Sequence, residues 1–129
     1  MWKSAFLLFL VAPQQAPARF VALDVYVDSG EKPLAAWQFE LACGAKIVAL
    51  EGAAGTPPYY DPAALQGGRI VVASFTTEPN PPRGRVLVAR LHMQETGSVE
   101  YAPRLVVAGA PGGARIDARI EIVRNGGKR

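Results

Sequence analysis

Apolar and polar residues alternate with a period of two along most of this chain. In residues 20–28, Val21, Leu23, Val25 and Val27 share one parity, and Asp24, Tyr26 and Asp28 take the other. Side chains of a β-strand point alternately to its two faces, so this pattern predicts a strand with one buried face and one wet face.

Six further segments have strand character, and Gly- and Pro-rich turns separate them. They are residues 35–43, 46–52, 69–77, 85–95, 99–110 and 114–123. In 85–95 the expected inward set is Leu87, Ala89, Leu91 and Met93, and in 114–123 it is Ile116, Ala118, Ile120 and Ile122. Many short strands with one-sided alternation predict an all-β fold, an antiparallel β-sandwich of seven or more strands. The only helix expected is a single turn within residues 61–66.

The first residues have the order of a secretory signal peptide. A positive charge at Lys3 precedes an apolar run over residues 5–12, and small residues follow at Ala16 and Ala18. The run is too short to span a bilayer, which needs roughly 20 apolar residues. We therefore expect a signal peptide over 1–18, a secreted domain over 19–123, a disordered basic tail over 124–129 and no membrane span. A buried N-terminal strand is the alternative.

The charge balance argues against nucleic acid as a partner. The formal net charge is +3, but four of the 14 basic residues lie in the expected leader and tail, and 11 acidic residues face the remaining ten. Nucleic-acid-binding domains gather Lys and Arg on one face. Here the basic residues are scattered singly among the strands.

Cys43 is the single cysteine, so no internal disulfide can form. It shares parity with Trp37, Phe39 and Leu41, which favours a thiol that points into the core and reacts slowly with reagents. The alternative is an exposed thiol used for intermolecular pairing, since Gly44 follows and the strand could already be turning outward there.

No catalytic or metal-binding pattern stands out. His92 is the single histidine, on the polar side of its strand, without a nucleophile in a suitable setting. Asp24, Asp28 and Glu31 could contact calcium, but they lack the dense glycine-bearing loop of a specific site, so solvated turn acids are favoured. We expect a non-enzymatic chain with no cofactor.

The connection over residues 51–68 is long for a compact domain and contains PPYYDPAALQGG. Tyr59, Tyr60 and Asp61 could bind a ligand. Alternatively the segment is a strap, with Leu65 and one tyrosine anchored over the end of the core. The strap is favoured, because apolar anchors beside prolines need no ligand to explain them.

Exposed aromatic residues on a β-sandwich can stack on sugar rings. The candidates are Tyr26, Tyr59, Tyr60 and Tyr101. Carbohydrate binding through Tyr59, Tyr60 and Asp61 is the second functional hypothesis, with a polysaccharide as the ligand.

The first hypothesis is protein binding through a sheet face. The polar sides of 85–95 and 114–123 would form a mixed-charge patch if both strands lie in one sheet. Its residues are Arg90, His92, Asp117, Arg119 and Glu121. An ordinary solvated face accounts for the same residues, because protein surfaces commonly mix charges in this way.

Residues 21–123 resemble the cohesin domain family. The stretch VALDVYVDSGEKPLAAWQFELACGAKIVALEG is similar to the family's opening strands, GRIVVASFTTE and GRVLVARLHMQ to its middle, and ARIDARIEIV to its last strand. The resemblance implies a jelly-roll sandwich of about nine strands, related to some cellulose-binding modules. It also implies docking of a dockerin-like partner on one sheet face, with calcium held by the dockerin.

Overall fold

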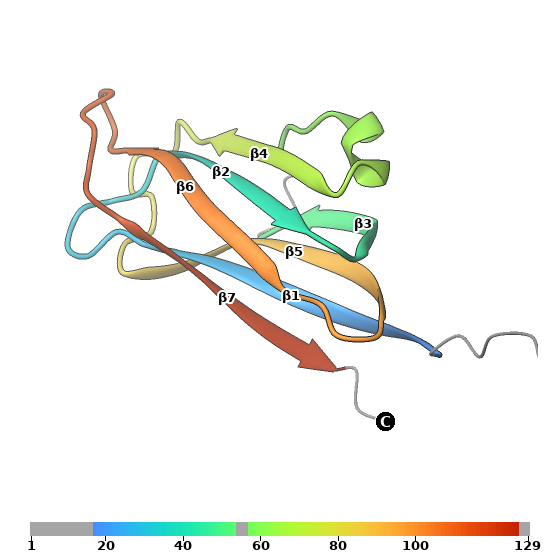
Figure 1. The fold of residues 1–129 in the computed structure, drawn as a ribbon. Helices are drawn as coiled ribbons and strands as arrows, with labels where there is room; N and C mark the ends of the chain where they lie inside the picture. The colour runs from blue at the N-terminus through green and yellow to red at the C-terminus, as the bar shows by residue number, and fades with distance from the viewer. Residues whose placement is uncertain (1–16, 54–56, 127–129) are drawn as a thin grey trace, which may run out of the picture.

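The computed structural model describes residues 17–53 and 57–126 as two β-sheets packed in layers (Figure 1). The strands are β1 (Ala18–Asp28), β2 (Ala36–Cys43), β3 (Lys46–Gly52), β4 (Arg69–Phe75), β5 (Arg85–Thr96), β6 (Tyr101–Gly109) and β7 (Arg119–Gly126). A short 3-10 helix, η2 (Pro62–Gln66), lies between β3 and β4. The expected all-β antiparallel sandwich is thereby confirmed, whereas the jelly-roll topology stays a prediction.

Successive strands belong to opposite sheets throughout the described chain. The four-stranded sheet has the order β3-β5-β1-β7, and the three-stranded sheet has the order β4-β2-β6. All pairings are antiparallel. Every connection therefore crosses from one layer to the other.

The core fills the space between the two inner faces, where the alternating apolar residues meet. Leu23 and Val25 of β1 face Phe39 and Leu41 of β2 across the layers, and all four side chains are fully buried. Burial of a side chain of this size stabilises the fold by about 1.5–3 kcal/mol. The period of two in β1 and β2 thus identifies these core residues correctly.

A bulge changes the expected alternation in β5. The register with β1 shifts between Val25 and Tyr26, so that Tyr26 lies opposite Leu87 and Val88 is passed over. Val88 and Ala89 are both buried, and Leu87 is not part of the core cluster. The expectation that Leu87 points inward is therefore wrong, because an extra residue in one strand reverses the parity beyond it.

The last predicted strand is divided between the two sheets. Arg115 bridges Gly109, and the amide of Ile116 donates to the carbonyl of Ala108, so this part continues the edge of β6. The chain then crosses over, and β7 begins at Arg119. Ile116 keeps its inward parity because both sheets face the same core.

The expected tail also needs correction. Residues 124–126 belong to β7 and pair with β1, where Arg124 lies opposite Leu23. Only 127–129 of the expected tail, and 1–16 of the expected signal peptide, lie outside the described residues. Ala18, the last residue of that expected leader, begins β1 and pairs with Thr96. No helix in the part of the chain described is long and apolar enough to span a membrane.

The proline-rich connection has the anchors expected of a strap. Tyr60, Ala64 and Leu65 pack against the core cluster. The side chain of Asp61 accepts a hydrogen bond from the amide of Ala63 at 3.0 Å and so caps η2. Tyr59 differs from its neighbour, since 63% of its surface is exposed.

We expect Tyr60→Ala to lower the melting temperature and Tyr59→Ala to leave it nearly unchanged. The first change removes an anchor from the core and should cost roughly 1–3 kcal/mol, whereas the second removes a mostly exposed ring. Thermal unfolding followed by circular dichroism compares the two variants. Equal losses would show that the strap is held by its backbone and not by the Tyr60 side chain.

Cys43 ends β2 and is half-buried rather than fully enclosed. Its thiol lies 3.4 Å from the carbonyl oxygen of Ala45 and packs against the core. Burial raises the pKa of the Cys43 thiol, which agrees with the expectation of slow reaction. The strand ends at this residue, and its side chain stays partly exposed.

Candidate functional site

The outer face of the four-stranded sheet carries most of the residues that the sequence suggested for protein binding. Arg90 makes two hydrogen bonds to Asp24, at 2.6 and 3.3 Å, and Asn125 donates a third to the same carboxylate. His92 Nε2 lies 2.6 Å from Oε2 of Glu51. Arg90 and His92 therefore already have partners within the domain.

The predicted mixed-charge patch is only partly assembled. Arg90 and His92 of β5 lie in the same sheet as Arg119 and Glu121 of β7, but β1 separates the two strands. Glu121 pairs with Arg85 at 2.9 Å, and Arg119 lies 3.9 Å from Asp28.

Asp117 is not in β7 but in the crossover before it. The sequence alone could not show that Glu121 pairs with Arg85 or that Arg119 lies near Asp28, because each partner comes from a different strand.

The four tyrosines and the three candidate calcium ligands are dispersed. Tyr26 packs under the guanidinium of Arg85, which lies 3.7 Å above its ring. Tyr101 bonds to a buried carboxylate, and Tyr60 anchors the strap. Among the described residues, no three His, Cys, Asp or Glu side chains gather closely enough to hold a metal ion.

A buried ion cluster, which was not predicted from the sequence, closes one end of the sandwich. Glu95 is 1% exposed. Its carboxylate accepts hydrogen bonds from Arg124 at 2.6 and 2.9 Å, from Arg19 at 3.1 Å and from the Tyr101 hydroxyl at 2.6 Å. The arginine partners, Arg124 first, lower the pKa of Glu95 to about 2. Burial and this carboxylate raise the pKa of Tyr101.

The parity of Glu95 was the available signal, since it follows Leu91 and Met93 on the inward side. The lowered pKa of the carboxyl and the raised pKa of the phenol both oppose proton transfer near neutral pH. The cluster therefore fits a structural clamp between the layers and not an acid–base site.

The outer face of the three-stranded sheet is different, because it leaves large apolar side chains in solvent. Val71 is 41% exposed and Phe75 61% exposed, and they lie on the same side of β4. Tyr59 bridges Ala73 beside them, and its ring lies parallel to that of Phe75 with centroids 6.2 Å apart. We call Tyr59, Val71, Ala73 and Phe75 the β4 face.

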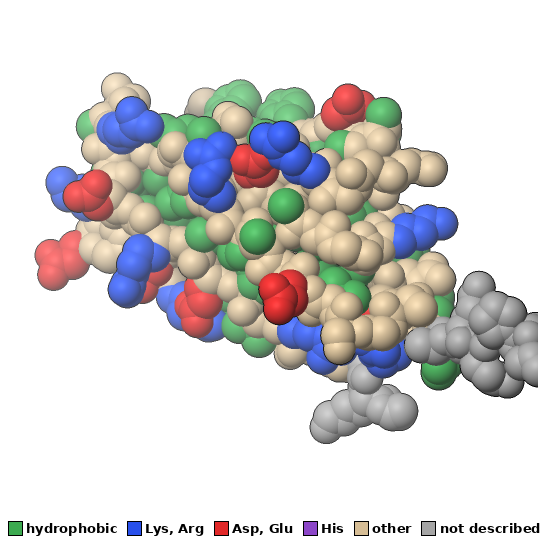
Figure 2. Space-filling model, viewed as in Figure 1, with side chains coloured by type: hydrophobic (Ala, Val, Ile, Leu, Met, Phe, Trp, Pro, Cys, Tyr) green, Lys and Arg blue, Asp and Glu red, His purple; other side chains and the backbone are tan. Residues whose placement is uncertain are grey.

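A three-residue ion cluster borders the β4 face. Glu40 of β2 lies between Arg69 of β4 and Arg104 of β6, with Arg104 at 2.7 Å. The hydrogen bond from Arg104, followed by that from Arg69, lowers the pKa of Glu40. Two guanidinium groups share one carboxylate, and both stay about two-thirds exposed, so this end of the face keeps an excess positive charge. Figure 2 shows basic and acidic side chains interspersed with exposed hydrophobic atoms over the surface in view.

Tyr59 was a candidate from the sequence, but its partners on the β4 face were not. Val71, Ala73 and Phe75 alternate along the strand segment 69–77, and that parity could have placed Phe75 on an outer face. The near-continuous apolar character of the segment hid it, because such runs are also typical of strands buried on both sides.

In comparisons with known proteins, no protein-family model, curated protein or solved structure matches this chain.

Proposed function

We propose that this protein is a secreted, non-catalytic module that binds another protein through the β4 face. The observation that carries the proposal is the exposure of Tyr59, Val71 and Phe75 side by side on one sheet. Contiguous exposed apolar side chains on a domain this small commonly mark an interaction surface. Aromatic residues are enriched in the fully buried centres of such interfaces.

The charges beside the β4 face suggest the chemistry of the partner. Arg69 and Arg104 present exposed guanidinium groups at the end where β4 begins. A partner with an apolar patch and an acidic group next to it would complement both features. This role agrees with the resemblance to cohesins, in which a dockerin-like partner docks on one sheet face.

The outer face of the four-stranded sheet is the weaker candidate for the same role. Most of its charged side chains are matched in pairs across β3, β5, β1 and β7. Binding there would require replacing existing ion pairs, which gives little net gain. These pairs support placing the proposed interface on the three-stranded sheet instead.

The test compares the same substitution on the two sheets. Partners captured from the secreted fraction by wild-type protein are identified, and the affinity of each purified partner is measured by calorimetry. Val71→Asp places a charge in the middle of the β4 face and should weaken binding at least tenfold, or about 1.4 kcal/mol. Phe20→Asp is the control, because Phe20 is 69% exposed on the other sheet.

Equal affinity of the wild type and the Val71→Asp variant for every captured partner would remove the β4 face from consideration. Loss of binding in the Phe20→Asp variant alone would move the interface to the four-stranded sheet. Both variants must keep the wild-type circular dichroism spectrum for the comparison to count.

A second proposal is carbohydrate binding, now centred on Tyr59 and Phe75. The parallel arrangement of these exposed rings is the observation that favours it. Tyr60 anchors the strap and Asp61 caps η2, so neither is assigned to a sugar.

Depletion of the protein by insoluble cellulose, chitin or xylan tests the sugar proposal. Depletion by one polymer that the double variant Tyr59→Ala/Phe75→Ala abolishes would support it. Protein that stays in solution with all three polymers would rule out binding to these polysaccharides.

A further inference from the structure

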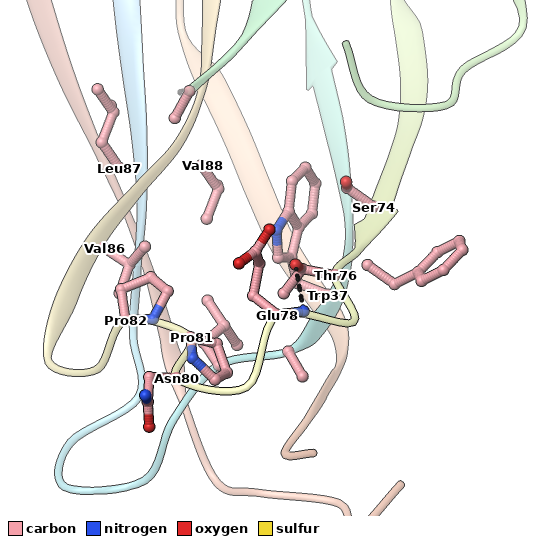
Figure 3. Close-up of a pocket in the computed structure, with 14 residues that line it drawn as sticks. Trp37, Ser74, Thr76, Glu78, Asn80, Pro81, Pro82, Val86, Leu87 and Val88 are labelled. Atoms are coloured by element: carbon pink, nitrogen blue, oxygen red, sulfur yellow. Dashed lines mark hydrogen bonds between the residues drawn. The ribbon is translucent and has the colours of Figure 1, made fainter. Parts of the chain in front are cut away.

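A cavity of about 420 Å³ opens between the two sheets next to the β4 face. Phe75 belongs to both, because it lies on the β4 face and also lines the cavity. The cavity is bounded by β2 and the end of β4, by β5, and by the connection from β4 to β5 (Figure 3). A volume of this size is in the range of sites that hold small organic groups.

The walls of the cavity are mostly apolar, and Trp37 is their largest side chain. Other apolar residues that line the cavity are Leu34, Pro81, Pro82 and Val88. Trp37 is half-buried, and its indole stacks on Phe39 at 5.6 Å between centroids. The indole is thus fixed in place by the core while part of it stays accessible from the cavity.

The polar groups of the cavity come from one rim. Ser74, Thr76, Glu78 and Asn80 lie along the end of β4 and the connection that follows it. The amide of Glu78 donates to the Thr76 hydroxyl at 3.1 Å, which fixes the turn. Figure 3 shows the Glu78 carboxylate turned toward the Trp37 indole.

Glu78 is the single charged side chain among the residues that line this cavity. Within the described part of the chain, none of the ion pairs involves Glu78. An unpaired carboxylate beside an indole is a favourable setting for a cation, because the carboxylate and the aromatic ring both attract positive charge.

We propose that this cavity holds the side chain of a lysine from the bound partner, with its alkyl chain against the apolar walls and its ammonium group between Glu78 and Trp37. This inference rests on the proposed protein-binding function and adds a specific anchor to it. A few side chains that fill pockets on the partner surface commonly carry most of the binding energy of an interface. The partner would then present an acidic group toward Arg69 and Arg104 and a lysine toward Glu78.

The test uses small probes, so that it does not depend on finding the partner. The full chain with Trp2→Phe leaves Trp37 as the single tryptophan, and its indole N–H is followed by two-dimensional NMR. Nα-acetyl-lysine methylamide is titrated in parallel with its Nε-acetylated form, which has nearly the same chain but no charge. We expect the charged probe to bind about five- to tenfold tighter, because its ion pair with Glu78 adds to a cation–aromatic contact with Trp37 that alone provides about twofold.

Glu78→Gln is the deciding variant, because it keeps the side-chain length and removes the charge. The preference for the charged probe should fall to about twofold or less, while Glu121→Gln, the same change at a half-exposed glutamate of the four-stranded sheet, should leave it unchanged. An indole signal that does not move with the charged probe overturns the proposal. Equal affinity for both probes, or an unchanged preference in Glu78→Gln, also overturns it. A positive probe result together with a neutral Val71→Asp in partner binding would keep the cavity site and reject the β4 face.

Discussion

Glu95→Gln should destabilise the protein by about 3 kcal/mol, a large part of the stability of a domain of this size. The variant leaves the guanidinium groups of Arg19 and Arg124 without their shared anion at the end of the core. It also weakens the bond to Tyr101, which connects β5 of one sheet to β6 of the other. Urea denaturation followed by circular dichroism measures the loss.

Glu121→Gln is the matched control for this prediction. Glu121 also pairs with an arginine, Arg85, but both side chains are about half exposed. Surface ion pairs of this kind contribute about 0–1 kcal/mol. A similar loss of stability in the two variants would show that the Glu95 cluster is no stronger than a surface pair.

The ion cluster at Glu95 should also determine how steeply the free energy of unfolding falls at low pH. The pKa of Glu95 in the folded protein is about 2, against 4.5 for an ordinary glutamate. Because the folded pKa is the lower one, this contribution is fully present above about pH 4.5 and is lost as the pH falls toward 2. Glu95→Gln should therefore show a flatter decline of stability between pH 5 and pH 2 than the wild type, measured by urea denaturation at each pH.

Phe39→Ala should cost about 3–5 kcal/mol, because it opens a cavity in the centre of the sandwich. Phe39 is fully buried, and it supports the indole of Trp37. The variant should unfold at a much lower urea concentration than the wild type.

The control is Phe20→Ala, the same chemical change at a ring that is 69% exposed. The free energy of unfolding of this variant should stay within about 1 kcal/mol of the wild-type value, since little packing is lost. A loss of stability in Phe20→Ala as large as that in Phe39→Ala would contradict the placement of the core between the sheets.

The fold class was accessible from the sequence because burial on one face of a strand leaves a period of two. The inward sets of β1 and β2, with Leu23, Val25, Phe39 and Leu41, are those that parity indicates. The single helical turn and the core anchor at Leu65 were likewise predicted, since Pro, Gly and isolated apolar residues act locally.

Features that depend on register were not accessible. The bulge at Val88 leaves no mark in the sequence, and it moved Leu87 off the inner face. The ion pairs Arg90–Asp24 and Arg124–Glu95 join residues that are 66 and 29 positions apart. The cavity at Trp37 arises from two sheets and a connection, so no single segment encodes it. The candidate site could be predicted only at Tyr59.

The alternation of successive strands between the two layers has a consequence for how the protein reaches its native state. Within the described residues, no two strands that follow each other in sequence pair as a hairpin, so no pair of neighbouring strands among them can form early as a local unit. The pairing of β1 with β7 even joins the two ends of the described chain. Each pairing must close a long loop before it gains any contacts, and folds dominated by such pairings form in milliseconds to seconds. During that interval the apolar strands are exposed together, so self-association of unfolded chains competes with folding.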